Sequence, residues 1–95
     1  MMLPQDFQTA YTRLLLDTLR HPDTRENRRL DTLARCRRWL EPTVQRALAR
    51  RIETNCHHSQ LAARWMCLAQ LMREGGDHRR DGTPDRQDLD TLGLT

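Results

Sequence analysis

Apolar residues recur every three or four positions along most of the first 74 residues, the spacing that places them on one face of an α-helix. The first stripe predicts a helix over residues 4–20, whose apolar face is formed by Phe7, Ala10, Tyr11, Leu14, Leu15 and Leu19. Proline suits the first turn of a helix and disfavours helix in the residue before it. Pro4, Pro22 and Pro42 therefore frame segments of about one helix each.

The second predicted helix begins at Asp23. Residues 23–26 read Asp-Thr-Arg-Glu, the form of a capping box, in which the first side chain and a glutamate three residues later bind free backbone amides. The apolar positions that follow are Leu30, Leu33, Ala34 and Leu40, with Trp39 near the edge of the stripe.

A third helix is expected from Pro42 or the next residue, and it loses its apolar stripe over residues 54–58. No glycine or proline forces a break there, so two alternatives stay open. One is a turn, with Asn55 or Ser59 capping a new helix. The other is a single helix that continues to Glu74. We favour the turn.

The segment from Ser59 to Glu74 has the broadest apolar stripe of the chain. So broad a stripe is typical of a central bundle helix, or of a helix that is buried on one side and bound to a partner on another. The residues expected in the core are Leu61, Trp65, Leu68 and Met72. The candidates for partner docking are Trp65, Met66 and Leu71. Trp65 therefore belongs to both groups.

Gly75 and Gly76 end the last strong stripe, and the remaining residues are rich in aspartate and poor in large apolar side chains. This composition predicts a flexible, disordered acidic tail over 75–95, with a possible short docking turn at 88–92. Fifteen leucines stand beside one valine and one isoleucine, which disfavours a sheet. We therefore expect an all-α domain over 1–74, a small antiparallel bundle of three or four helices.

Charge is segregated along the chain, whose net charge is +3. Residues 20–51 contain ten arginines and four acids, a net charge of +6, whereas residues 74–95 have a net charge of −3. All 16 basic residues are arginine. An acidic C-terminal segment could therefore fold over the basic helices and mask them.

The arginine-rich face is the strongest candidate for contact with an acidic protein or a nucleic acid. Its residues are Arg28, Arg29, Arg35, Arg38, Arg46, Arg50 and Arg51. Three interpretations stay open: a solvated face with ion pairs between helical turns, an acidic protein partner, or the phosphates of a nucleic acid. Residues 44–68 also permit a helix-turn-helix, although the turn lacks glycine and the second helix is very apolar for a DNA groove. The side chains that its second helix would offer to DNA are His57, His58, Ser59, Gln60 and Arg64.

No pattern for catalysis or metal binding stands out. The three cysteines contain no Cys-x-x-Cys pair, and Cys56 and Cys67 are eleven residues apart, so we expect neither a metal site nor a cofactor. Cys36 lies between two arginines that would lower the pKa of a reactive thiol, but a packing role is favoured. A glycine-rich phosphate loop and a convincing Ser-His-Asp set are both lacking.

These patterns predict a small non-enzymatic adaptor or regulatory protein that acts by protein–protein docking, on another protein or on itself as a homodimer. The alternative is an arginine-rich transcriptional regulator that binds DNA or RNA. The first residues have neither the basic nor the apolar part of a signal peptide, so a cytoplasmic protein with free thiols is expected. No apolar run approaches the ~18 residues of a membrane span.

Overall fold

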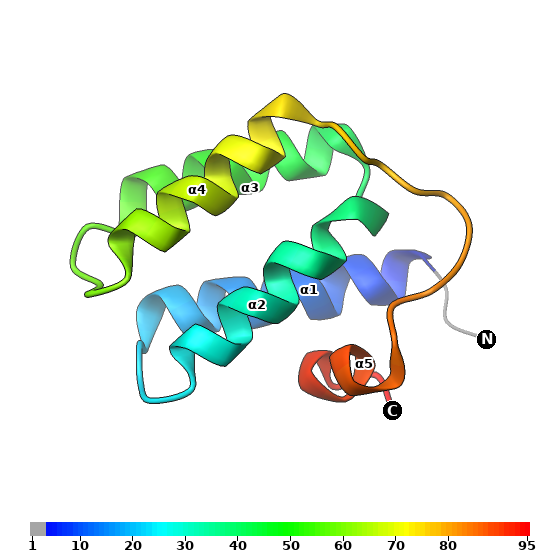
Figure 1. Cartoon of the computed structure of the whole chain (residues 1–95), viewed down its shortest axis with the longest axis horizontal. Coiled ribbons are helices and arrows are strands. Elements are labelled where there is room, and N and C mark those ends of the chain that lie inside the picture. Colours follow the sequence, from blue (N-terminus) through cyan, green and yellow to red (C-terminus); the bar gives the residue numbers. More distant parts are fainter. Residues whose placement is uncertain (1–3) are drawn as a thin grey trace.

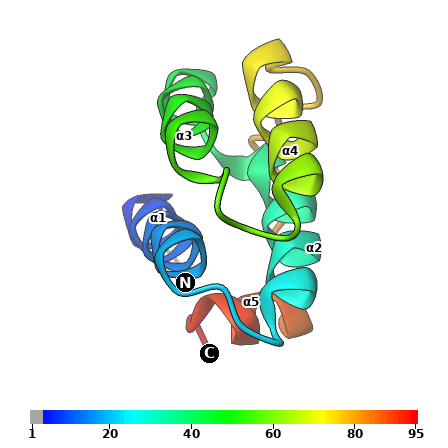
Figure 2. The ribbon, with the colours of Figure 1, turned by 90° about the vertical axis from the view of Figure 1, so that its left-hand side faces the viewer.

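Two helical hairpins lie one over the other in the computed structural model, which describes residues 4–95. The elements are α1 (Pro4–Arg20), α2 (Glu26–Cys36), the 3-10 turn η1 (Arg37–Trp39), α3 (Pro42–Asn55), α4 (Ala62–Glu74) and α5 (Arg86–Leu92). Figures 1 and 2 show α3 above α1, α4 above α2, and α5 below both α1 and α2. The predicted all-α class is therefore confirmed for the part of the chain that the structure describes.

Helix α1 has the predicted bounds and buries the predicted stripe. Tyr11 and Leu15 are inaccessible to solvent, and Phe7 is nearly so. The Tyr11 hydroxyl donates a hydrogen bond of 2.6 Å to the carbonyl oxygen of Leu33, which ties α1 to α2 through the core. Burial raises the pKa of Tyr11 well above 10.0, so this donor stays protonated.

The predicted capping box at the start of α2 is wrong. Asp23 Oδ1 accepts a hydrogen bond of 2.8 Å from the backbone N–H of Arg25 in a tight turn, and the helix begins later, at Glu26. Glu26 does not reach back to cap, because its side chain points into the protein and is 5% exposed. There Glu26 Oε2 accepts hydrogen bonds from Ser59 Oγ at 2.7 Å and from Trp65 Nε1 at 3.1 Å.

The favoured turn between the third and fourth predicted helices is confirmed. The chain leaves helix after Asn55 and re-enters it at Ala62. The expected cap is wrong, because Leu61 is the N-cap and makes no side-chain cap, whereas Ser59 Oγ accepts a hydrogen bond of 2.9 Å from the backbone N–H of Leu61 within the turn. Figures 1 and 2 show α3 and α4 side by side along their lengths. The helices of a helix-turn-helix instead cross steeply, at roughly 90–120°.

The expected disorder over 75–95 is not what the structure shows. The chain leaves α4 at Gly75, whose φ of +65° suits a residue without a side chain, and crosses the molecule to α5. Asp85 caps α5 by accepting a hydrogen bond of 2.8 Å from the backbone N–H of Asp88, and Leu92 is buried. This fifth helix was not predicted, because what holds it are distant contacts with α1 and α2.

Candidate docking surfaces

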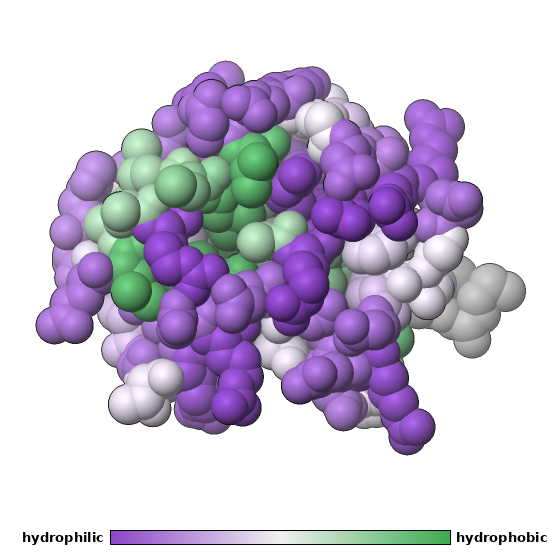
Figure 3. All heavy atoms as spheres, viewed as in Figure 1, coloured by the Kyte–Doolittle hydropathy of each residue, from purple (hydrophilic) through white to green (hydrophobic). Residues whose placement is uncertain are grey.

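A shallow apolar groove of about 280 Å³ runs between α2 and α4. Its lining residues are Leu30, Ala34, Ala63, Arg64, Cys67, Leu68 and Leu71. Figure 3 shows apolar side chains gathered on this face of the molecule and surrounded by polar ones. Six of the seven lining side chains are uncharged, so the groove can take an apolar side chain without desolvating a carboxylate.

Helix α4 forms one wall of this groove and has two faces of different character. The buried face consists of Trp65, Leu68, Ala69 and Met72. The opposite face is formed by Ala63, Met66, Cys67, Gln70 and Leu71, and we call it the free face of α4. Met66 is 40% exposed and Leu71 is 39% exposed, and they are the exposed large hydrophobic residues of the described chain.

Ion pairs to neighbouring helices border the free face on both sides. Arg64 Nη2 lies 2.6 Å from Asp31 Oδ1 on α2, and Arg64 also donates to the Asn27 side chain. On the α3 side, Arg73 donates to Glu53 through Nε at 2.9 Å and Nη2 at 2.5 Å. Because both arginines already have carboxylate partners, the free face between them is close to neutral.

The three predicted docking residues divide into two groups. Met66 and Leu71 lie where a partner can reach them. Trp65 was wrong as a docking residue, because its side chain is fully buried and its indole N–H is bonded to Glu26. Its position among leucines at helical spacing was the signal that correctly placed it in the core as well.

The seven predicted arginines are spread over three elements, α2, η1 and α3. Figure 2 shows α2 and α3 diagonally across the molecule, but Arg46 near the start of α3 lies beside Gly75, close to η1. Arg35 and Arg38 are paired with carboxylates of the C-terminal segment. The other five of the seven predicted arginines make no ion pair with any residue in the range 4–95. They are Arg28, Arg29, Arg46, Arg50 and Arg51.

The side chains that a helix-turn-helix would use on DNA have structural partners instead. Ser59 is buried against Glu26, and Arg64 is held by Asp31. His58 Nε2 lies 3.0 Å from the carbonyl oxygen of Leu19. Three of the side chains expected on a recognition helix are therefore used within the fold.

The C-terminal segment, residues 75–95, is fastened to α2 by a buried carboxylate. Asp88 accepts hydrogen bonds from Arg35 Nε at 3.2 Å and Arg35 Nη2 at 2.8 Å, and Thr32 Oγ1 lies 3.4 Å from it. The hydrogen bond from Arg35 lowers the pKa of Asp88 although burial opposes the shift. Asp88 is therefore a carboxylate at neutral pH.

The same segment is fastened to η1 near its start. Arg38 Nη2 lies 3.0 Å from Asp77 Oδ2, and the backbone N–H of Arg79 donates to the carbonyl oxygen of Arg38 at 2.6 Å. The expectation that the acidic segment folds over the basic helices is thus confirmed at Arg35 and Arg38.

The other two side chains of η1 bind the backbone of the segment. Arg37 Nη1 donates to the carbonyl oxygen of Gly76 at 3.1 Å, and Trp39 Nε1 donates to that of Asp81 at 3.0 Å. We call residues 32–39 the basic strip, and its contacts with the C-terminal segment come from Thr32, Arg35, Arg37, Arg38 and Trp39. In the sequence, Asp88 stands out only as part of the possible docking turn at 88–92, and Arg37 only as a neighbour of Cys36. Their contacts were not predicted, because each acts through residues about 40 or 50 positions away.

The thiols differ in accessibility. Cys36 and Cys56 are buried, whereas Cys67 is exposed on the free face of α4. Burial, together with the charge of Asp88, raises the pKa of Cys36 to about 12 despite the neighbouring arginine. A thiolate at Cys36 is therefore disfavoured, and the favoured packing role is the one that the structure supports.

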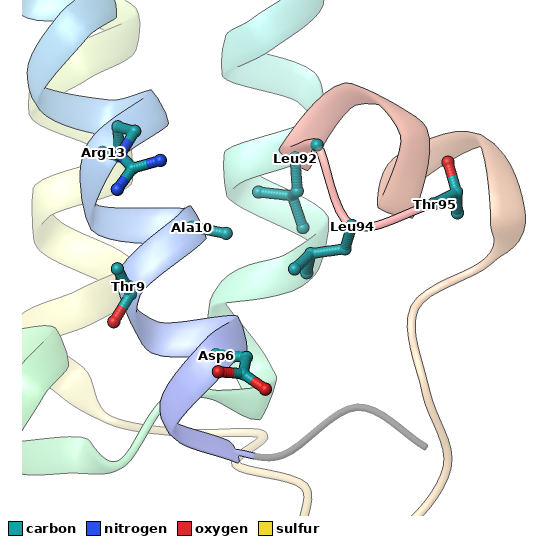
Figure 4. Close-up of a pocket in the computed structure, with 8 residues that line it drawn as sticks. Asp6, Thr9, Ala10, Arg13, Leu92, Leu94 and Thr95 are labelled. Atoms are coloured by element: carbon teal, nitrogen blue, oxygen red, sulfur yellow. The ribbon is translucent and has the colours of Figure 1, made fainter.

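A cavity of about 880 Å³ lies between α1 and the residues that follow α5. Figure 4 shows Asp6 and Arg13 of α1 at opposite ends of this opening, with Leu92 and Leu94 across from them. A specific small-molecule site needs several polar groups that point to one place. The side chains around this opening do not provide such a group of polar atoms.

Among residues 4–95, no three His, Cys, Asp or Glu side chains lie close enough together to hold a metal ion. None of the helices in this range combines the length and the apolar character that crossing a membrane would need.

The free face of α4 with its groove, and the basic strip beneath the C-terminal segment, are thus the two surfaces that geometry singles out. Comparison of the chain with protein-family models, with curated proteins and with solved structures found no match.

Proposed function

We propose that this chain is a small non-enzymatic adaptor or regulatory protein that acts by protein–protein docking, and that it docks first on a second copy of itself. The observation that carries the proposal is the exposed, uncharged free face of α4 beside an apolar groove. A chain of 95 residues has a small core, and self-association is a common way to stabilise such a domain.

The spacing of side chains on α4 favours a second copy as the occupant. Ala63 and Leu71 lie four residues on either side of Cys67. In a two-fold antiparallel pair centred near Cys67, the large Leu71 of one copy lies beside the small Ala63 of the other, next to the groove. A small residue opposite a large one is the arrangement that allows two helices to pack closely.

Charge at the helix ends favours the same arrangement. The first turn of α4 contains no acidic residue, and Glu74 ends the helix. Antiparallel pairing brings Glu74 of each copy toward the N-terminal end of the other α4, where the helix dipole favours a negative charge. The contribution is modest, about 0.3–1 kcal/mol at an exposed site.

Light scattering coupled to size exclusion, over a range of protein concentrations, tests the proposal. The wild-type chain should have the mass of a dimer, and Leu71→Arg should be monomeric, because a buried guanidinium without a partner would disrupt the apolar contact. Gln8→Arg adds the same charge on an exposed position of α1 and should stay dimeric.

Crosslinking of Cys67 provides a second, independent readout. A short bismaleimide reagent should join two copies through Cys67, because the other two thiols are buried. Cys67→Ser should abolish the crosslinked species. A chain that is monomeric at every concentration and does not crosslink would reject the second copy as partner.

The nucleic-acid alternative is tested in the same preparations. Binding of a DNA or RNA duplex that weakens steeply with salt, and that is lost when Arg46, Arg50 and Arg51 are replaced together, would favour it over docking. We give it less support, because Arg35 and Arg38 are already paired with carboxylates of the C-terminal segment.

A further inference from the structure

We infer that the basic strip on α2 and η1 is a binding surface for an acidic peptide segment of another protein, and that the C-terminal segment of this chain occupies it as an internal ligand. This inference goes beyond self-association through α4, because it concerns a different surface. It rests on two observations. The strip presents hydrogen-bond donors and acceptors that suit a carboxylate and a peptide backbone, and the C-terminal segment leaves some of these donors without a partner.

One part of the strip recognises a carboxylate. Arg35 offers two parallel N–H donors to Asp88, at 3.2 and 2.8 Å, and Thr32 offers a hydroxyl to the same group. Two parallel donors from a guanidinium match the geometry of a carboxylate. An aspartate or glutamate of another chain would fit this position equally well.

The other part of the strip recognises a peptide backbone. Arg37 and Trp39 donate to main-chain carbonyl oxygens of the segment, and the carbonyl oxygen of Arg38 accepts from a main-chain N–H. Contacts of this kind do not depend on the side chains of the bound segment. The contact with the Arg38 carbonyl oxygen requires an N–H donor, which the sugar–phosphate backbone of a nucleic acid lacks, and it therefore favours a peptide.

The internal ligand leaves part of the strip unsatisfied. Arg37 is 8% exposed, and among the described residues no carboxylate lies within ion-pair distance of it. The Nε atoms of Arg37 and Arg38 are buried without an acceptor. Buried charges are normally paired, so a peptide with a further carboxylate near Arg37 would bind the strip better than the internal segment does.

The internal segment is also held by few apolar contacts, which favours its displacement by another peptide. Pro84, Asp88 and Leu92 are the buried residues within it, so few apolar contacts hold it in place. An external peptide must nevertheless compete with a segment tethered to the same molecule, whose effective concentration is high. The full chain is therefore expected to bind acidic peptides weakly until the internal contacts are loosened.

Fluorescence anisotropy at low salt tests this inference with a labelled synthetic peptide of residues 75–95 as the probe. The full-length variant Asp77→Asn/Asp88→Asn should bind the peptide about tenfold more tightly than the wild-type chain, because the internal carboxylates no longer compete. A peptide with its acidic residues replaced by the corresponding amides should bind neither protein.

Matched arginine variants locate the binding. In the double-asparagine background, Arg38→Ala should weaken peptide binding about tenfold, whereas Arg50→Ala, which removes the same charge from α3, should not. If the double variant loses its circular dichroism signal, Asp77→Asn alone, at an exposed position, provides the same comparison with wild type.

Three results would overturn the inference. They are equal peptide affinity in wild type and in the folded loosened variant, equal effects of Arg38→Ala and Arg50→Ala, and tighter binding of a single-stranded oligonucleotide through the same arginines. Light scattering on the same samples reports self-association separately, so failure of the peptide surface and failure of the α4 dimer are distinguishable.

Discussion

Helices α1 to α4 meet through fully buried apolar side chains such as Leu15, Leu33 and Ile52. The C-terminal segment meets α2 and η1 mainly through ion pairs and single hydrogen bonds, for example between Arg35 and Asp88. Apolar burial is insensitive to salt and to pH, whereas charged contacts near the surface are weakened by both. Two parts of one small chain are therefore expected to respond differently to the same conditions.

Helices α1 to α4, which we call the body, also make polar contacts with one another. Some of these contacts are buried and link the α1–α2 hairpin to the α3–α4 hairpin. Glu26 begins α2 and accepts hydrogen bonds from Ser59 in the turn after α3 and from Trp65 on α4. In the C-terminal segment the corresponding partners remain partly open to water; the side chain of Arg35 is 56% exposed. A hydrogen bond in the core contributes more to the free energy of unfolding than one that is open to water, because the dielectric constant around it is lower.

Replacing Trp65 should have the largest effect on the body. Trp65→Ala removes the largest fully buried side chain and leaves Glu26 with one fewer donor. We expect a loss of about 3–5 kcal/mol in the free energy of unfolding, enough to unfold much of a domain of this size. Urea denaturation followed by circular dichroism measures it, and Met66→Ala on the exposed face should cost far less.

Replacing Glu26 should come next. Glu26→Ala leaves the buried Trp65 N–H and the Ser59 hydroxyl without their acceptor, at a cost of about 2–4 kcal/mol. Glu26→Gln keeps one acceptor oxygen and should be intermediate. If Glu26→Ala were as stable as wild type, the buried carboxylate would not be what joins the two hairpins.

Replacing Asp88 should loosen one region and spare the other. Asp88→Asn keeps the shape of the side chain and removes its charge, at a cost of about 1–2 kcal/mol. Amide hydrogen exchange should accelerate in α5 and remain slow in α1 to α4. Equal acceleration in both regions would contradict the separation between body and segment.

The pH response follows from the same residue. Because the pKa of Asp88 is lowered from 3.8 in the folded chain, its pairing stabilises the fold above that pH and is lost as the pH falls toward the folded value. The protection of the α5 amides, measured relative to their intrinsic exchange rate at each pH, should therefore fall below about pH 4 in the wild type. The Asp88→Asn variant should lack this acid-dependent part.

Replacing Arg64 should have the smallest effect. Arg64→Ala breaks an exposed ion pair with Asp31, and such pairs contribute about 0–1 kcal/mol. Thermal unfolding should change little for Arg64→Ala, and it should change as little for Arg73→Ala on the other border of the free face. A large loss would mean that these borders, and not the core, hold α4 in place.

Local signals were enough where a helix is defined by its own residues. The bounds of α1, the start of α3 at Pro42 and the end of α4 before Gly75 all follow from proline, glycine and the apolar stripe. Local signals failed at Asp23, where the motif for a capping box was present but Glu26 had a better partner in the core. The Glu26 side chain accepts hydrogen bonds from the buried Ser59 and Trp65 donors and is therefore not available to cap the helix.

The sequence by itself determined the all-helical class, the apolar faces and the separation of basic from acidic segments, because periodicity and composition act between near neighbours. Only the tertiary structure decided that Trp65 is no part of a docking face, that Arg35 and Arg38 are paired with the C-terminal segment, and that 75–95 is held in place. Those outcomes depend on pairs such as Arg35 and Asp88, which are 53 residues apart and meet only after the helices have packed.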